Sequence, residues 1–360
     1  MALRYTVLIF CLGTISFFAC NQKENANKNI SADLIQKSQA LKQTEENLLA
    51  GFSNAVCYSG FRNGQHPDRG DGAINPTYEE ILEDLSILSY NSNFNLIRLY
   101  DSGINSEMVL NVIKENDINI KVMLGIWLSA ELSNHKNCEW LDSIPEETLR
   151  NNKTLNLQEI NNGIRLANEY PEIVVAVNVG NEALVNWTDH LVDVDTIISY
   201  VKQVKKSTNQ PITVAENYKW WAEQGLALSK ELDFIAVHVY PVWENKDIDE
   251  GMSYTIENLL EVRNALPDSK IVISEAGWAT ISSEFGDRAS EEKQLQYYNE
   301  MVSFAKEMNI TTFIFEVFDE EWKGDPGNML GAEKHWGLFT TDRKPKKVMS
   351  ELYIHLLEQK

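Results

Sequence analysis

From residue 50 onward the chain repeats one pattern, in which a short apolar run is usually followed by an amphipathic stretch. The apolar runs cover residues 51–58, 94–100, 120–127, 173–179, 211–215, 234–240, 270–274 and 312–317. The amphipathic stretches cover residues 77–90, 106–116, 157–170, 193–207, 254–266, 290–308 and 346–357. Near-continuous apolar strands that alternate with helices indicate a parallel sheet covered on both faces. Eight such cycles in about 310 residues predict an α/β fold, a (β/α)8 TIM barrel that forms a single domain.

A doubly wound open sheet is the alternative fold for the same alternation of strands and helices. That fold usually places a glycine-rich phosphate-binding loop after its first strand. No such loop follows residues 51–58. The barrel is therefore the prediction for residues 49–360. A long connection over residues 128–156 is expected to cross the face where the strands end.

The first 19 residues are expected to be a lipoprotein-type signal peptide rather than part of the fold. Arg4 gives a positive start, and residues 6–18 form an apolar stretch of roughly 13 residues, which is short for a membrane span. Ala19-Cys20 is similar to the end of a bacterial lipoprotein signal, in which the cysteine is lipidated. We expect export and a lipid anchor on Cys20, at the periplasmic or surface face of the outer membrane. Ordinary secretion and a retained anchor are the alternatives.

Residues 20–48 are polar at first and are predicted to be a tether, with a short helix feasible near residues 34–49. The formal net charge of −21 argues against nucleic acid as a partner, because a polyanion would be repelled. A neutral sugar polymer does not feel this charge. In the expected domain, Cys57 and Cys138 could pair, although nothing in the sequence requires it. The Cys and His residues lack metal-site spacing, and we expect neither a metal nor an organic cofactor.

Two glutamates end strongly apolar runs and carry the main functional signal. Glu182 closes the run that begins at residue 173, and Glu275 closes the run that begins at residue 270. In a parallel barrel, catalytic groups collect at the C-terminal ends of the strands. Two carboxyl groups there are the minimal equipment for cleaving a glycosidic bond. Either glutamate alone could be a helix cap or a surface charge. Rival carboxylates follow other strands: Glu216, Glu316, Asp319, Glu320 and Glu321.

Other strand ends add polar groups around this pair. Arg98 and Tyr100 end the second apolar run, and His238 and Tyr240 end the sixth. A buried arginine is costly unless a carboxylate pairs with it, so Arg98 is expected to hold a nucleophile ionised. Tyr240 could donate a hydrogen bond to a carboxylate. His238 is expected to be a satisfied residue inside the barrel.

All nine tryptophans lie at or beyond the C-terminal ends of the predicted strands. A large flat face with one polar N–H suits a pyranose ring, which is apolar on its faces and polar at its rim. Packing in the core is the alternative for any one of them. A sugar-binding role is predicted for Trp127, Trp187, Trp221, Trp243, Trp278, Trp322 and Trp336.

Asn181-Glu182 after the fourth strand, with a glutamate after the seventh, resembles the large superfamily of retaining glycosidases built on this barrel. More narrowly, the chain looks like glycoside hydrolase family 17, the β-1,3-glucanases. The segments that carry this resemblance are residues 97–100, 179–182, 273–278, 315–323 and 335–339. The resemblance implies that Glu182 is the acid/base and Glu275 the nucleophile, with Asn181, Glu320 and Lys323 in the active-site network. Residues 57–64 and the loop around Cys138 depart from the common plant pattern of that family.

The resulting hypothesis is a single catalytic domain that cleaves laminarin-like β-1,3-glucan within its chains by retaining double displacement. A glucanosyltransferase on the same site, another β-glycan specificity, and a lipid-anchored binding protein without activity are the alternatives. The expected partners are a neutral β-glucan and a membrane, reached through Cys20, and the chain is expected to be a monomer. The sequence leaves open whether the enzyme acts within chains or at their ends, and whether water or a sugar is the acceptor.

Overall fold

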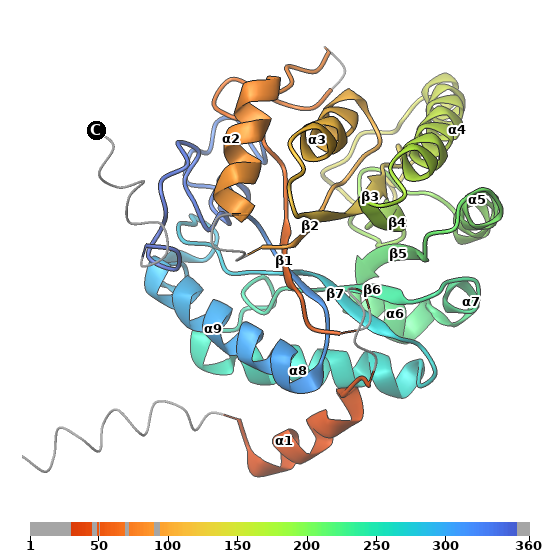
Figure 1. The fold of residues 1–360 in the computed structure, drawn as a ribbon. Helices are drawn as coiled ribbons and strands as arrows, with labels where there is room; N and C mark the ends of the chain where they lie inside the picture. Colours follow the sequence, from red (N-terminus) through yellow and green to blue (C-terminus); the bar gives the residue numbers. More distant parts are fainter. Residues whose placement is uncertain (1–29, 45–48, 50, 69–71, 90–93, 351–360) are drawn as a thin grey trace, which may run out of the picture.

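The computed structural model describes residues 30–44, 49, 51–68, 72–89 and 94–350 (Figure 1). Its eight strands form a closed parallel barrel in which each strand pairs with the next along the chain and β8 closes onto β1. The strands are β1 (Asn54–Cys57), β2 (Leu96–Arg98), β3 (Lys121–Ile126), β4 (Val174–Asn181), β5 (Ile212–Asn217), β6 (Ile235–Val239), β7 (Ile271–Ala276) and β8 (Thr312–Ile314). The predicted single-domain (β/α)8 barrel is confirmed.

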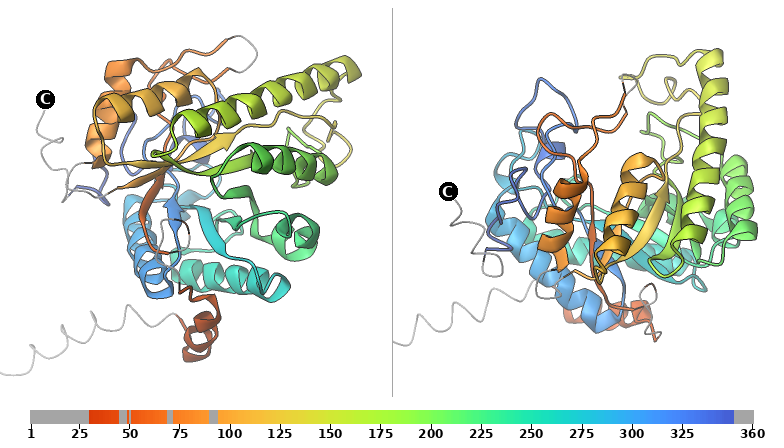
Figure 2. Two further views of the ribbon diagram at one scale, coloured as in Figure 1. Left: turned by 45° about the vertical axis from the view of Figure 1, so that its right-hand side comes forward. Right: turned by 45° about the horizontal axis from the view of Figure 1, so that its top comes forward.

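Helices surround this barrel on the outside, as two further views show (Figure 2). They are α2 (Tyr78–Ser89), α3 (Ile104–Glu115), α4 (Glu146–Glu169), α5 (Val194–Ser207), α6 (Tyr218–Gln224), α7 (Leu226–Ser229), α8 (Ile248–Ala265) and α9 (Glu291–Met308). At the start of α2, the Glu80 amide donates to Thr77 Oγ1 at 3.2 Å and the Thr77 amide donates to Glu80 Oε2 at 2.8 Å. These two reciprocal bonds form a capping box.

The strands are buried on both faces, as a parallel barrel requires. Every residue of β6 and β7 is buried, and five of the six residues of β3 are. The apolar side chains of the barrel and of the inner helix faces form one continuous core. This core fixes the strand ends, and through them the side chains that project beyond those ends.

Several element boundaries differ from the sequence-based prediction. Helix α4 begins at Glu146 and not near residue 157, because Pro145 and two acidic residues form a good helix start ahead of a polar face. The connection after β3 is therefore shorter than predicted. Helix α8 begins at Ile248, where the Asp247 side chain caps the helix. Residues 346–350 form no helix, and residues 351–360 lie outside the described part of the chain.

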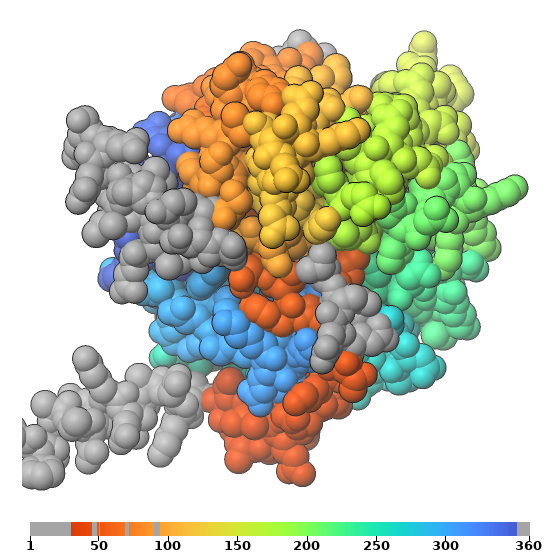
Figure 3. Space-filling view, in the orientation of Figure 1, coloured from red at the N-terminus to blue at the C-terminus, as the bar shows by residue number. Residues whose placement is uncertain are grey.

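The first described segment lies at the N-terminal end of the barrel. It forms α1 (Ala32–Ser38) and a 3-10 turn (Gln39–Leu41), less than the helix predicted over residues 34–49. Gln43 then donates its side-chain amide to Ile271 O at 2.8 Å and its backbone amide to Met308 O at 2.9 Å. Helix α1 packs against α8 at the edge of the molecule (Figure 3). Among the described residues, none of the helices has the length and apolar character needed to cross a membrane.

Candidate active site

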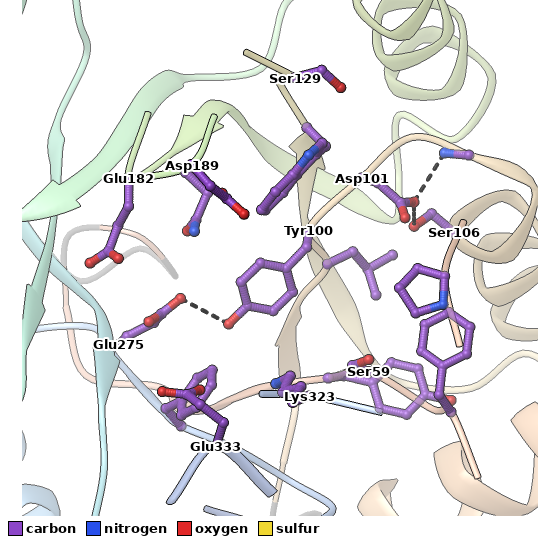
Figure 4. Close-up of a pocket in the computed structure, with 18 of the residues that line it drawn as sticks. Ser59, Tyr100, Asp101, Ser106, Ser129, Glu182, Asp189, Glu275, Lys323 and Glu333 are labelled. Carbon is purple, nitrogen blue, oxygen red and sulfur yellow. Dashed lines mark hydrogen bonds between the residues drawn. The ribbon is translucent and has the colours of Figure 1, made fainter. Parts of the chain in front are cut away.

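A cavity of about 1270 Å³ opens at the C-terminal ends of the strands (Figure 4). It exceeds the roughly 300–1,000 Å³ of a typical small-molecule site. Side chains from every part of the barrel contribute to its wall. They include Tyr58 after β1, Tyr100 after β2, Trp127 after β3, Glu182 after β4, Asn217 of β5, Tyr240 after β6, Glu275 of β7 and Phe315 after β8.

Glu275 lies at the end of β7, with 8% of its side chain exposed. Its Oε1 accepts hydrogen bonds from Arg98 Nη1 at 2.6 Å and from the Tyr100 hydroxyl at 2.9 Å. Its Oε2 accepts from the Tyr240 hydroxyl at 2.6 Å. Burial alone would raise the pKa of Glu275, but the electrostatic influence of His238 and Arg98 and the two tyrosine hydrogen bonds hold that pKa below its usual value. The arrangement therefore fixes an ionised carboxylate.

Arg98 is fully buried and links β7 to β4. Besides Glu275, its guanidinium donates to Ser274 O at 3.0 Å and to the side-chain oxygen of Asn181. It also lies 4.5 Å from the centre of the Tyr100 ring. The structure thus brings together the strand-end residues that the sequence singles out, and it ties the position of Asn181 to that of Glu275.

Glu182 stands at the mouth of the cavity, directly after β4, with 27% of its side chain exposed. Its φ of 46° lies in the left-handed region, where few residues other than glycine are found. Gly180, two residues earlier, has a φ of 91°, a conformation that residues with a side chain rarely adopt. The Glu182 amide donates to Ala215 O at 2.9 Å, so the turn is anchored to β5.

His238 is fully buried and contacts both glutamates. Its Nδ1 is 2.9 Å from Glu182 Oε1 and 3.4 Å from Glu275 Oε2, and its Nε2 is 3.2 Å from Arg98 Nη1. Because the guanidinium can only donate, Nε2 is the acceptor and Nδ1 carries the proton that faces Glu182. The buried imidazole is satisfied, as expected, and it also couples the two carboxyl groups.

Two of the rival carboxylates after β8, Glu316 and Glu320, form ion pairs with one lysine. Lys323 Nζ lies 2.5 Å from Glu316 Oε2 and 2.6 Å from Glu320 Oε2. Glu320 Oε1 also accepts from the Ser59 hydroxyl at 2.5 Å and from the Trp322 indole at 2.8 Å. Glu316 and Glu320 are fully buried, whereas Lys323 reaches the cavity wall. Of the strand-end carboxylates that the sequence singles out, Glu182 and Glu275 line the cavity and the rivals do not.

Glu333 is a cavity residue that sequence reasoning missed. It lies in a 3-10 turn (Ala332–Lys334), beyond any strand end, so neither strand position nor periodicity marks it. Figure 4 shows Glu333 with Glu182 and Glu275 along one side of the cavity. Burial raises its pKa, and the charges of Glu275 and Glu182 add to this against the lowering effect of Lys323. A proton on Glu333 would make it a hydrogen-bond donor toward a ligand.

Five of the seven predicted sugar-binding tryptophans line the cavity. Trp127, Trp187 and Trp243 are the most open, at 36%, 47% and 43% exposure. Trp127 is stacked on one side against His190, with ring centres 4.5 Å apart. Trp322 and Trp336 also contribute to the wall, although Trp336 is almost fully buried.

Trp221 and Trp278 are core residues, which corrects the sugar-binding role predicted for them. Both indoles are buried and neither lines the cavity. Trp221 donates its N–H to Ala236 O at 2.8 Å, and Trp278 donates to Arg288 O at 2.8 Å. Each ring turns back onto the barrel, since α6 and the loop after β7 direct it toward the core.

The two described cysteines are unpaired and buried, so the disulfide that the sequence allowed is not formed. Cys57 donates to Ser274 O at 3.3 Å, and Cys138 donates to Asn186 O at 3.0 Å. Within the described part of the chain, no group of three or more His, Cys, Asp or Glu side chains is placed to hold a metal ion.

Comparison with known proteins gives a family and several relatives. The BtgE/BtgC glycoside hydrolase domain matches residues 55–337. A glucan 1,3-beta-glucosidase of Arthroderma benhamiae is 27% identical over 246 residues, covering 63% of this chain and 70% of that protein. A putative glucan endo-1,3-beta-glucosidase, btgC, of Aspergillus niger is 26% identical and covers 75% of this chain, but the chain spans only 40% of its length. The crystal structure of an endo-laminarinase from Formosa Hel1_33_131 superposes with a TM-score of 0.71 at 26% identity, covering 85% of this chain and 88% of that one.

Proposed function

Because this chain belongs to the family of BtgE/BtgC glycoside hydrolase domains, we propose that it is a retaining glycosidase that hydrolyses β-1,3-glucosidic bonds within laminarin-like chains. The observation that carries the proposal is the placement of Glu182 and Glu275 against the same nitrogen of the His238 imidazole. One carboxyl group is held ionised by Arg98 and two tyrosines, while the other stands at the open mouth. A nucleophile and an acid/base need these two environments.

The spacing of the two carboxyl groups supports retention. One oxygen of each carboxyl group approaches the same nitrogen, at 2.9 and 3.4 Å, so these two oxygens are at most 6.3 Å apart. Retaining enzymes hold the two groups roughly 5–5.5 Å apart, whereas inverting enzymes leave roughly 6.5–9.5 Å for a water molecule. The limit on the oxygen–oxygen distance lies below the range of inverting enzymes, which supports retention.

The reaction then proceeds in two displacements. Glu275 attacks the anomeric carbon, and the bond to the leaving sugar breaks while Glu182 gives its proton to the departing oxygen. Glu182 next takes a proton from water, whose oxygen displaces Glu275 and restores the original configuration. Arg98, Tyr100 and Tyr240 hold the Glu275 carboxylate in line for attack.

The substrate assignment rests on the cavity wall and on the relatives. Open indole faces at Trp127, Trp187 and Trp243 suit pyranose rings, and a neutral glucan is not repelled by a strongly acidic chain. The matched relatives are described as a glucan 1,3-beta-glucosidase, a putative glucan endo-1,3-beta-glucosidase and an endo-laminarinase. Two of these three descriptions name cleavage within the chain, which favours endo action here. We propose that the enzyme acts as a monomer.

The test uses a soluble protein that starts after Cys20, incubated with linear β-1,3-glucan, laminarin, mixed-linkage glucan and mannan. Proton NMR of the first-formed product reports the anomer, and chromatography reports product length. Short oligosaccharides that appear first as β-anomers from the β-1,3-glucans are the expected result. First-formed α-anomers would refute retention, glucose alone would refute endo action, and products longer than the substrate would indicate a transferase.

We also propose that the enzyme is exported and anchored to a bacterial outer membrane by lipid on Cys20, which lies outside the described residues. The proposal rests on the lipoprotein-like end of the first 20 residues. Wild type and Cys20→Ser should be compared by membrane fractionation of a bacterial host and by mass spectrometry. Wild type is expected in the membrane fraction with added acyl mass, and Cys20→Ser is expected to lose both. An unmodified wild-type protein in the soluble fraction would refute the anchor.

A further inference from the structure

Glu216 is a buried carboxyl group that the two displacements do not use. It lies in β5, next to the strand that carries Glu182, and its exposed fraction is 0%. It is not among the residues that line the cavity. A carboxyl group in such a place needs a physical reason, because an uncompensated buried charge is strongly destabilising.

The contacts of Glu216 are with the turn that follows Glu182. Its Oε1 accepts a hydrogen bond from the Leu184 amide at 3.0 Å. On the other side of the same turn, the Glu182 amide donates to Ala215 O at 2.9 Å. These two bonds hold the turn to β5 on either side of Glu182, whose backbone is in the left-handed region. Such a conformation persists only where the surroundings enforce it.

The other oxygen of Glu216 indicates its charge state. Oε2 is buried and has no hydrogen-bond partner among the described residues. Burial raises the pKa of Glu216 well above its ordinary value, and the negative charge of Glu182 raises it further, against the lowering effect of the Leu184 and Ala183 amides. A neutral carboxylic acid still offers an oxygen to the Leu184 amide without placing a second negative charge beside Glu182.

We propose that Glu216 is a positioning residue that, as a neutral acid, holds the turn on which the acid/base Glu182 stands. This inference rests on the proposed glycosidase function. It predicts that the acceptor oxygen of Glu216 matters for proton donation to the leaving group, while its capacity to ionise does not. A residue that only fills the core would instead affect the stability of the protein and leave the chemistry of the folded enzyme unchanged.

The experiment compares Glu216→Gln, which keeps an acceptor oxygen and cannot ionise, with Glu216→Leu, which removes the acceptor. Thr213→Val is the matched control, since Thr213 is a buried residue of the same strand whose hydroxyl donates to Phe234 O at 2.9 Å, away from the turn. Each variant is assayed on laminarin, whose leaving group needs a proton, and for burst release of fluoride from β-laminaribiosyl fluoride, whose leaving group needs none.

Glu216→Gln is expected to keep kcat within about 3-fold and to leave the pH profile of kcat/KM unchanged. Glu216→Leu is expected to lower kcat on laminarin about 10- to 100-fold, part of what general acid catalysis contributes, while the fluoride burst falls far less. Thr213→Val should keep both rates.

Three results would each overturn the inference. They are wild-type kinetics on laminarin for Glu216→Leu, equal losses on both substrates for Glu216→Leu, and a shifted pH profile for Glu216→Gln. If Glu216→Leu does not fold, a shifted pH profile for Glu216→Gln would still overturn the inference. Inactive wild type would instead refute the proposed function.

Discussion

Glu275 and Glu182 face the same cavity but stand in very different surroundings. Glu275 is almost buried and receives hydrogen bonds from an arginine and two tyrosines, all anchored in the barrel. Glu182 is three times as exposed, stands on a left-handed turn, and receives a hydrogen bond from His238. In the proposed mechanism, the group that must keep its charge is enclosed by donors, whereas the group that must give and take a proton is left near solvent. The following predictions test this contrast.

The largest effect is expected for Glu275→Ala, because this change removes the proposed nucleophile. We expect kcat on laminarin to fall about 10⁴-fold or more. Azide, which can enter the vacated space, should restore turnover of an activated β-laminaribioside and give an α-glycosyl azide. Asp84→Asn is the control, since Asp84 is also a buried carboxylate paired with an arginine, Arg343, but lies away from the cavity. A β-azide from Glu275→Ala would contradict the assignment.

The next largest effect is expected for Glu182→Ala. We expect kcat on laminarin to fall about 10²- to 10⁴-fold, the usual contribution of general acid and base catalysis. Formation of the covalent intermediate from β-laminaribiosyl fluoride should be nearly unaffected. Azide should then give a β-glycosyl azide, the opposite anomer from Glu275→Ala. Equal losses on laminarin and on the fluoride would mean that Glu182 is not the proton donor.

A smaller effect is expected for Tyr240→Phe, which removes one donor from Glu275. A hydrogen bond to a charged group contributes about 1.5–3 kcal/mol, so kcat/KM should fall roughly 10- to 100-fold. The lowered pKa of Glu275 should rise toward its ordinary value, which moves the acidic limb of the pH profile to higher pH. Tyr297→Phe, another buried tyrosine, whose hydroxyl contacts Thr255, should leave that limb in place. An unmoved limb in Tyr240→Phe would refute the electrostatic role.

The same contrast predicts how stability depends on pH. Because the folded pKa of Glu275 is depressed, its contribution to the free energy of unfolding is present above its ordinary pKa and is lost as pH falls through the lowered value. Urea unfolding of wild type and Glu275→Gln should therefore give curves that converge toward low pH. A difference in the free energy of unfolding that stays constant from pH 7 to pH 2 would contradict the depressed pKa.

The smallest kinetic effect is expected among the tryptophans. Trp127→Ala should raise KM for laminarin several-fold with little change in kcat or melting temperature, since one ring face is open to the cavity. Trp221→Phe should lower the melting temperature and leave KM unchanged, because that indole is buried behind the wall. The opposite result, a raised KM in Trp221→Phe alone, would show that Trp221 contributes to sugar binding.

The glutamate pair and Arg98 could be predicted because each ends an apolar run, and parallel strands bring their C-terminal ends to one face. The direction in which a side chain points was harder to predict than the strand end at which it lies. Trp221 follows β5 as expected, but α6 turns its ring inward, which depends on packing and not on sequence order. Glu333 reaches the cavity from a 3-10 turn, where no period marks which side chains point inward. The early start of α4 was not predicted, because the first turns of this helix are mostly polar and show little apolar periodicity.

The attachment of residues 30–44 at the N-terminal end of the barrel has a consequence for the proposed anchor. Gln43 is bonded to the start of β7 and to the end of α9, at the opposite end of the barrel from the cavity. The anchor proposed on Cys20 would therefore join the chain ahead of a segment that is attached at the end of the barrel away from the cavity. In an enzyme tethered in this way, the height of the barrel would separate the cavity from the attached segment. A long polymer could then reach the cavity without contact with the membrane.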